Sequence, residues 1–362
     1  MGISAVNQGH GHPKIRAAMI EQFDRVALVS RTIYNDRLPE WQEYITKLLG
    51  YDRVCFMNTG VEGTETCVKF ARRWGYDGKG IPDGQATIVF AKGNFWGRSI
   101  AACGSSDDPK RFARFGPFNG LNFELVEYGN AQEVEALFKS NPHIAGIVLE
   151  PIQGEAGVIL PPPGYFKKIR ELCDQYNVLL VADEIQTGLG RTGKLMGMDW
   201  YEGVRPDIVA LGKSLSGGVY PISACVADDK VMKHIQPGDH GSTYAGNPLS
   251  AAIGLAAVKV IVEEKLPENA LEQGAFISKS MNELRKQYPF LVDFRGPGLM
   301  LALEFDKDYK KQSTDFYKRM IEEGILAIAS KGPKIRFFPP LTIKRAIAEE
   351  LVEKLEKIMK TF

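Results

Sequence analysis

The chain has 362 residues, with 45 Lys or Arg and 44 Asp or Glu, so its formal net charge is only +1. This balance provides no excess of basic side chains for nucleic acid or an acidic membrane surface, so neither partner is expected. The length suggests two domains. The five cysteines stand singly, with no Cys-x-x-Cys pair, which argues against a disulfide framework.

The sequence carries no membrane or targeting signal. No apolar run approaches the ~18–20 residues that a transmembrane helix needs. Residues 1–10 form neither a signal peptide nor an Arg-rich transit peptide. We therefore expect a cytoplasmic protein, or one of the mitochondrial matrix if a further N-terminal segment belongs to it.

Short runs of Val, Ile and Leu alternate with helical patterns from about residue 12 to residue 265. Runs that are apolar throughout are typical of strands covered on both faces by helices, and hence of a mostly parallel sheet. The predicted strands are Arg53–Met57, Thr87–Ala91, Phe123–Tyr128, Ile144–Leu149, Val178–Ala182, Ile208–Leu211 and Ile222–Val226. The predicted helices between them include Glu62–Trp74, Ala131–Ser140 and Tyr165–Tyr176.

The pattern changes after a long predicted helix from Pro248 to about Leu266. The elements predicted beyond it are helices at Ala270–Gln287, Ser313–Glu323 and Ile343–Met359 and strands at Leu291–Arg295, Leu299–Glu304 and Lys334–Phe338. We therefore predict an α/β protein with two domains. A three-layer large domain covers residues 1–265, of which residues 1–11 are a residual N-terminal segment, and a smaller α+β domain covers residues 266–362.

Two neighbouring predicted strands end in groups of opposite charge. Asp183 follows one buried run, and Lys213 follows the next. Ligands of open α/β sheets bind at the carboxyl ends of the strands. A lysine there can hold the aldehyde of pyridoxal phosphate as a Schiff base, and an aspartate can keep the pyridine nitrogen protonated.

A phosphate site is predicted where the strand Arg53–Met57 ends. Thr59 and Glu62 fit a capping box at the start of a helix, and Gly60 lets the backbone approach a ligand. The free N–H groups of a helix N-terminus favour an anion.

Two further strand ends carry candidate ligand contacts. Phe95 and Trp96 precede Arg98, an arrangement that can stack on a flat ring and hold a carboxylate. Glu150 and Glu155 follow another strand, and they can act as acid and base or as partners for arginines.

Other motifs are poorer matches. Gly188–Gly193 reads G-x-G-x-x-G, but a dinucleotide-binding turn must follow its strand at once and open a helix, which this segment does not. Gly212-Lys213-Ser214 lacks the leading glycine of a phosphate loop. The five histidines show no metal-binding spacing, so no metal site is expected.

Taken together, the motifs resemble the class III pyridoxal phosphate aminotransferases of fold type I, and among them the ornithine aminotransferases. The resemblance covers essentially the whole chain. It is carried by the stretches Ser4–His10, Met57–Val61, Gly93–Arg98, Glu150–Gly157, Ala182–Gly188, Leu211–Gly218, Gly241–Pro248 and Ile335–Pro340.

The resemblance implies a role for each cofactor contact. Lys213 would hold pyridoxal 5'-phosphate and shuttle a proton, and Asp183 would pair with the pyridine nitrogen. The remaining cofactor contacts would be Gly60 and Val61 at the phosphate, Phe95 on the ring, Gln186 at the ring hydroxyl, and Ser242 and Thr243. Thr243 would reach the phosphate from the neighbouring subunit, so a homodimer with shared active sites is expected.

The resemblance also implies how two unlike substrates share one pocket. Arg98 and Arg336 would bind carboxylates, and Glu155 would neutralise Arg336 while ornithine reacts. Glu155 would then swing away so that Arg336 can take the α-carboxylate of 2-oxoglutarate.

The sequence departs from the ornithine aminotransferases at its start. Ile3 stands where they commonly have a tyrosine that can orient the substrate, and an aliphatic residue there resembles the 4-aminobutyrate aminotransferases. A further N-terminal segment with a substrate-contacting aromatic residue is expected in the family and is absent from the sequence. Transfer from N-acetylornithine or 4-aminobutyrate, an aminomutase reaction, a nicotinamide oxidoreductase and a non-catalytic protein that holds the cofactor remain alternatives.

Overall fold

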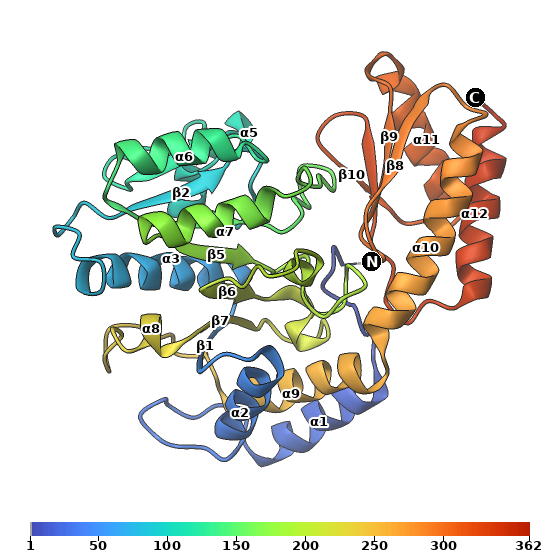
Figure 1. Ribbon diagram of the computed structural model, residues 1–362. Helices are drawn as coiled ribbons and strands as arrows, with labels where there is room; N and C mark the ends of the chain where they lie inside the picture. Colours follow the sequence, from blue (N-terminus) through green and yellow to red (C-terminus); the bar gives the residue numbers. More distant parts are fainter. Residues whose placement is uncertain (1) are drawn as a thin grey trace.

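The structure, a computed structural model, describes residues 2–362 and contains two β-sheets, each with its own helices (Figure 1). The larger sheet has seven strands in the order β1-β7-β6-β5-β4-β2-β3. Its strands are β1 (Arg53–Met57), β2 (Thr87–Ala91), β3 (Phe123–Val126), β4 (Ile144–Leu149), β5 (Leu179–Asp183), β6 (Ile208–Leu211) and β7 (Ser223–Ala227). Only β7 runs antiparallel to its neighbours on both sides. The predicted mostly parallel sheet is thus confirmed.

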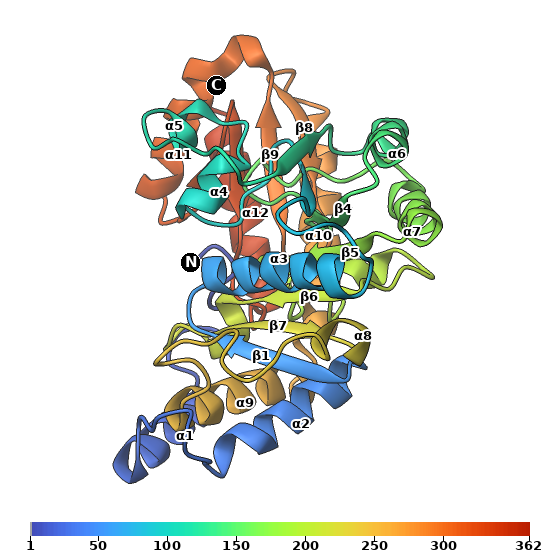
Figure 2. The ribbon, with the colours of Figure 1, turned by 90° about the vertical axis from the view of Figure 1, so that its left-hand side faces the viewer.

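Helices cover both faces of this sheet, as the continuous apolar runs indicated. Helix α3 (Gly60–Asp77) packs on one face, where Phe70 and Trp74 belong to the same buried cluster as Phe90 of β2 (Figure 2). Helices α6 (Ala131–Ser140) and α7 (Tyr165–Tyr176) pack on the other. Shorter helices connect the strands: α4 (Ile100–Gly104), α5 (Pro109–Phe112), α8 (Asp229–Met232), and the 3₁₀ turns η1 (Gly197–Trp200) and η2 (Lys213–Ser216).

A helical layer lies beside strand β1. It consists of α1 (Pro13–Arg25), α2 (Arg37–Leu49) and α9 (Pro248–Glu263). The sequence predicted one helix to about Leu266, but α9 ends at Glu263 and α10 (Leu266–Arg285) starts a new direction. Lys265, between them, has a left-handed backbone with φ +51°, which cannot continue a right-handed helix.

The second sheet has four antiparallel strands in the order β10-β11-β9-β8. They are β8 (Leu291–Arg295), β9 (Leu301–Phe305), β10 (Ile328–Ala329) and β11 (Lys334–Phe337). With them lie α10, the turn η3 (Lys307–Tyr309), α11 (Lys310–Glu322) and α12 (Arg345–Met359). We call residues 266–362 the C-terminal part; its independence as a domain stays a prediction. No helix of residues 2–362 is long and apolar enough to cross a membrane.

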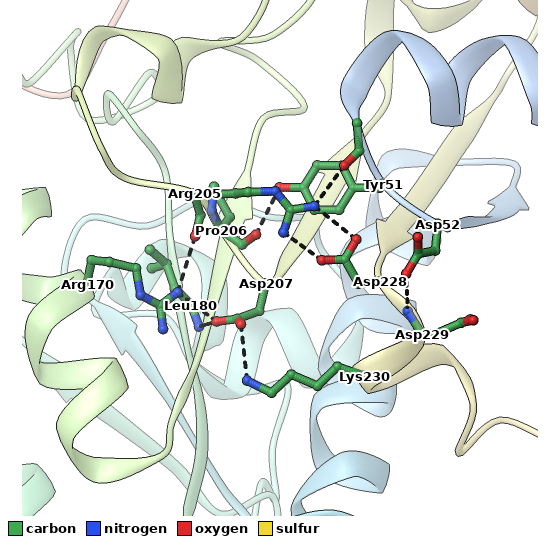
Figure 3. Close-up of polar contacts among 11 residues, drawn as sticks. Tyr51, Asp52, Arg170, Leu180, Arg205, Pro206, Asp207, Asp228, Asp229 and Lys230 are labelled. Atoms are coloured by element: carbon green, nitrogen blue, oxygen red, sulfur yellow. Dashed lines mark hydrogen bonds and ion pairs between the residues drawn. The ribbon is translucent and has the colours of Figure 1, made fainter.

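A polar network closes the edge of the large sheet at which the parallel strands begin (Figure 3). Asp207, just before β6, accepts hydrogen bonds from Arg170 of α7 and from the backbone N–H of Leu180 in β5, both at 2.8 Å. Arg205 binds both carboxylate oxygens of Asp228 at 2.6 and 2.9 Å. These contacts join strand ends at one edge, so the opposite edge, where the parallel strands end, is left for a ligand.

Candidate active site

A cavity of about 630 Å³ opens at the carboxyl ends of the parallel strands. Its lining brings together residues that the sequence had placed after five separate strands, including Gly60, Phe95, Glu150, Asp183 and Lys213. This convergence is the expected geometry of a ligand site in an open α/β sheet.

Lys213 follows β6 after Gly212, is partly exposed and lines the cavity. Its backbone has φ +46°, a strained conformation for a residue with a side chain, and such strain is commonly stored at functional sites. Enclosure by the surrounding protein lowers the pKa of its ammonium group, although Asp183 and Glu150 oppose the shift. A lowered pKa makes the neutral, nucleophilic amine more accessible.

Asp183 is the last residue of β5 and is buried. One carboxylate oxygen accepts the N–H of Ile185 at 3.1 Å, and the other is 3.5 Å from the hydroxyl of Thr64. Burial raises its pKa to about 6, and the nearby Lys213 partly offsets the effect. Two weak donors leave a buried carboxylate poorly satisfied, so a cationic partner in the cavity would stabilise it.

The N-terminus of α3 has the features that favour an anion. The capping box predicted for Thr59 and Glu62 is present, with the Thr59 N–H donating to Glu62 at 2.6 Å and the Glu62 N–H to the Thr59 hydroxyl at 3.5 Å. The N–H groups of Gly60 and Val61 donate to no residue of the described chain and lie at the positive end of the helix dipole.

The cavity also has a planar wall. Phe95 lines it, and the guanidinium of Arg111 lies 4.7 Å from the centre of the Phe95 ring. Gln186 lines the cavity too, and its side-chain oxygen is buried without a hydrogen-bond partner in residues 2–362. The amine, the under-satisfied carboxylate, the free N–H pair and the aromatic wall together fit a pyridoxal phosphate group.

The predicted pairing of Glu155 with Arg336 is present, although 181 residues separate them in the chain. Arg336, in β11, is 1% exposed and its Nη1 lies 3.0 Å from Glu155 Oε2. The same nitrogen donates to the Gly154 carbonyl at 2.9 Å. Arg98 lies at the cavity wall and forms no ion pair within the described chain. One arginine is therefore neutralised and the other is free.

Five of the predicted site residues do not line this cavity, namely the pair Glu155 and Arg336 described above, Ile3, Ser242 and Thr243. Ser242 accepts a hydrogen bond from Asn58 at 2.9 Å, and with Thr243 it lines a separate surface hollow. Ile3 packs beside the buried cluster that includes Ile152 and Phe338, on the Glu155 side of the site. The roles of Ile3, Ser242 and Thr243 stay predictions.

Two carboxylates that the sequence grouped together have different surroundings. Glu155 faces an arginine, whereas Glu150 accepts backbone N–H groups from Phe95 at 3.2 Å and Gly154 at 3.0 Å. Burial and the nearby Asp183 raise the pKa of Glu150 to about 8. Thr64, which hydrogen-bonds Asp183, was not predicted from the sequence; its only local signal is a small polar residue on the sheet-facing side of α3.

The glycine-rich segment at Gly188–Gly193 forms turns and leads into η1, not into a helix that could receive a dinucleotide. Gly298 packs against it so closely that a Cβ there would lie 2.4 Å from Thr192. The glycines of this region therefore permit close packing between the two sheets.

Comparison with known proteins also indicates an aminotransferase. The profile of the family "Aminotransferase class-III" matches residues 1–359. The mitochondrial ornithine aminotransferase of Drosophila melanogaster is 50% identical over 354 residues, which are 98% of this chain and 80% of that protein.

Solved structures of aminotransferases are similar to this chain over nearly its whole length. The ornithine aminotransferase of Toxoplasma gondii superposes with a TM-score of 0.96 at 41% identity, covering 99% of this chain and 85% of that one. One of its structures is described with partial occupancy of PLP at the active site. An acetylornithine aminotransferase from Elizabethkingia anophelis gives a TM-score of 0.89 at 39% identity, covering 99% and 88%.

Proposed function

The chain belongs to the class III aminotransferases, a pyridoxal phosphate-dependent family, and from that premise we propose that it transfers the δ-amino group of L-ornithine to 2-oxoglutarate. The products are glutamate 5-semialdehyde and glutamate, formed in two half-reactions. When bound, pyridoxal phosphate carries the amino group between the two substrates and withdraws electrons from the carbon that loses a proton.

Lys213 and Asp183 are the side chains of this protein that would take part in the reaction. The Lys213 amine would hold the cofactor through its aldehyde and would move a proton at the substrate carbon, and its lowered pKa suits both roles. Asp183 keeps its charge when a cationic ring nitrogen pairs with it. Gly60 and Val61 would hold the phosphate through their N–H groups, and Gln186 and Phe95 would hold the ring.

The observation that carries the choice of substrate is the closed ion pair between Glu155 and Arg336. Ornithine brings its δ-amine without a neighbouring carboxylate, so a free Arg336 would be a buried and unpaired charge during that half-reaction. 2-Oxoglutarate brings a carboxylate next to the reacting carbon, and it can replace Glu155 on Arg336. Arg98 is available for the carboxylate remote from the reacting carbon, which is the α-carboxylate of ornithine and the γ-carboxylate of 2-oxoglutarate.

The purified holoenzyme tests this proposal directly. We expect kcat/KM for L-ornithine to exceed the values for N-acetylornithine and 4-aminobutyrate when 2-oxoglutarate is the acceptor. A preference for N-acetylornithine would move the assignment to the second candidate, which the Elizabethkingia structure favours, and a preference for 4-aminobutyrate would support the interpretation of Ile3. A protein that binds the cofactor but reacts with no amine would overturn the assignment as an enzyme.

We also propose a homodimer in which Ser242 and Thr243 complete the phosphate site of the partner. The support is that neither residue lines the cavity of its own chain, while Gly60 and Val61 leave two N–H groups free. Thr243→Ala is expected to weaken cofactor binding without changing the mass measured by light scattering. A monomeric holoenzyme with full cofactor affinity would contradict the proposal.

We propose the cytoplasm as the location, in line with five cysteines that form no disulfide in the described chain. The mitochondrial names of relatives such as the Drosophila protein make the matrix the alternative. Fractionation of the source cells decides between them.

A further inference from the structure

The loop that carries Glu155 is held mainly by the C-terminal part of the chain. Residues 154–158, which we call the gate loop, follow β4 and reach toward the smaller sheet, where β10 lies beside them (Figure 1). A single β-bridge, between Gln153 and Ile159, closes the base of the loop. Its carbonyl groups accept hydrogen bonds from three side chains that lie more than 130 residues away in sequence.

Arg295, in β8, makes the most extensive of these contacts. Its Nη2 donates to the Gly157 carbonyl at 2.7 Å, and its Nε donates to the Val158 carbonyl at 2.8 Å. Its Nη1 is held by Asp293 at 2.8 Å and by Glu304 at 2.6 Å. The two carboxylates thus orient a planar guanidinium so that its other edge bridges two successive carbonyl groups of the gate loop.

Ser330 binds the backbone of the gate residue itself. Its hydroxyl donates to the Glu155 carbonyl at 2.8 Å, while its own N–H donates to Lys334 at 2.9 Å. Arg336 adds the bond to Gly154 described above. Successive positions of the gate loop are therefore tied to β8, to the turn before β11, and to β11.

The backbone of the gate loop requires such support. Gly157 has φ +112° and Val158 has φ +56°. The second value is strained for a β-branched residue and persists only where its surroundings impose it. Val158 is fully buried in the cluster with Met300 and Phe338 of the C-terminal part.

We propose that Arg295 and Ser330 are positioning residues that set amine specificity, because they hold the gate loop where Glu155 can cover Arg336. The inference rests on the proposed function, in which the pair keeps Arg336 from binding a carboxylate next to the reacting carbon during the ornithine half-reaction. Neither residue lines the cavity. When either contact is lost, Glu155 covers Arg336 for less of the time, and amine donors that carry a carboxylate on the reacting carbon, such as L-glutamate, gain access.

The test is the ratio of single-turnover rate constants for L-ornithine and L-glutamate, followed by the absorbance of the bound cofactor. Ser330→Ala is expected to lower the ornithine-to-glutamate ratio by about fivefold, the factor that one hydrogen bond of ordinary strength represents. Ser330→Thr keeps the hydroxyl and is expected to preserve the ratio. Arg295→Lys keeps the charge but not the two-carbonyl bridge, so a fall of on the order of tenfold is expected.

Arg285→Lys is the matched control. Arg285 also bonds a backbone carbonyl of β8, that of Val292 at 2.9 Å, and no hydrogen bond joins it to the gate loop in the described chain. Its replacement is expected to leave the ratio unchanged. Hydrogen–deuterium exchange gives a readout independent of turnover, because the N–H groups of Gly157 and Val158, bonded to Gly154, are expected to exchange faster in Ser330→Ala than in Arg285→Lys.

The outcomes separate the two proposals. A wild-type holoenzyme that does not react with ornithine refutes the proposed function. If the wild type reacts and Glu155→Ala lowers the ratio, but Ser330→Ala and Arg295→Lys leave both the ratio and the exchange unchanged, the positioning role is wrong. A ratio that falls equally in Arg285→Lys also overturns the positioning role, because the fall then reflects a general loss of stability in the C-terminal part and not the loss of contacts to the gate loop.

Discussion

Replacement of Asp183 by asparagine is expected to stabilise the cofactor-free protein while it damages the cofactor site. The two side chains have nearly the same shape, so the change removes charge and little else. Burial raises the pKa of Asp183 from 3.8 to about 6. At neutral pH this difference represents about 3 kcal/mol of free energy of unfolding that the ionised carboxylate costs the folded chain.

The direction of the Asp183 pKa shift determines how the free energy of unfolding depends on pH. Below pH 3.8 the carboxyl is protonated in both the folded and the unfolded chain and costs nothing. Between pH 3.8 and about 6 the folded chain binds more protons than the unfolded chain, so stability falls as the pH rises. Above about pH 6 the full cost is present. The Asp183→Asn substitution removes the Asp183 share of this dependence and also lowers the pKa of Glu150, which the Asp183 charge helps to raise.

Urea unfolding of the cofactor-free protein at pH 5 and pH 8, at one fixed protein concentration, measures the effect. We expect Asp183→Asn to be more stable than the wild type at pH 8 by up to about 3 kcal/mol, and the advantage to shrink at pH 5. Addition of pyridoxal phosphate is expected to stabilise the wild type more than the variant. A variant that is less stable than the wild type at pH 8 without cofactor would refute the reasoning.

Three further predictions concern the loaded enzyme. Lys213→Ala is expected to abolish turnover and the visible absorbance band that covalent attachment gives the cofactor; normal steady-state turnover would sink the assignment. Glu155→Ala frees the buried Arg336 to bind the α-carboxylate of L-glutamate. Because a hydrogen bond to a charged group is strong, the single-turnover rate with L-glutamate is expected to rise relative to that with L-ornithine by about 10- to 100-fold. An unchanged ratio would exclude the gate. Arg98→Gln removes the unpaired cation at the cavity wall, so KM for 2-oxoglutarate is expected to rise by about tenfold or more, a change that steady-state kinetics would detect.

The elements that were predicted well are those whose signal is local. Strands β1, β2, β4 and β6 have the predicted bounds because each is a short apolar run between polar turns. The boundary between α9 and α10 was misplaced, because the break at Lys265 is a single left-handed residue inside a pattern that is helical on both sides. Helix ends of this kind depend on packing more than on composition.

Lys213 and Asp183 were within reach of the sequence alone. Asp183 ends one buried strand and Lys213 follows the next by two residues. Parallel strands must end at the same edge of their sheet, so the chain order already places an amine and a carboxylate together. The same argument brought Gly60 and Phe95 to one cavity. The positions of these residues at one edge of the sheet can be predicted from the hydrophobic pattern and the strand direction. The local sequence shows both features.

The gate is a property of the tertiary structure. The resemblance to a family suggested that Glu155 meets Arg336, but nothing near either residue in the chain encodes the bonds from Arg295 and Ser330 to the gate loop. Those bonds form only when the two sheets pack together, because backbone carbonyls have no sequence signature and accept from whichever side chain the fold brings within reach. The sequence determined which groups meet at the cavity, and the packing of the C-terminal part decided how Glu155 is held against Arg336.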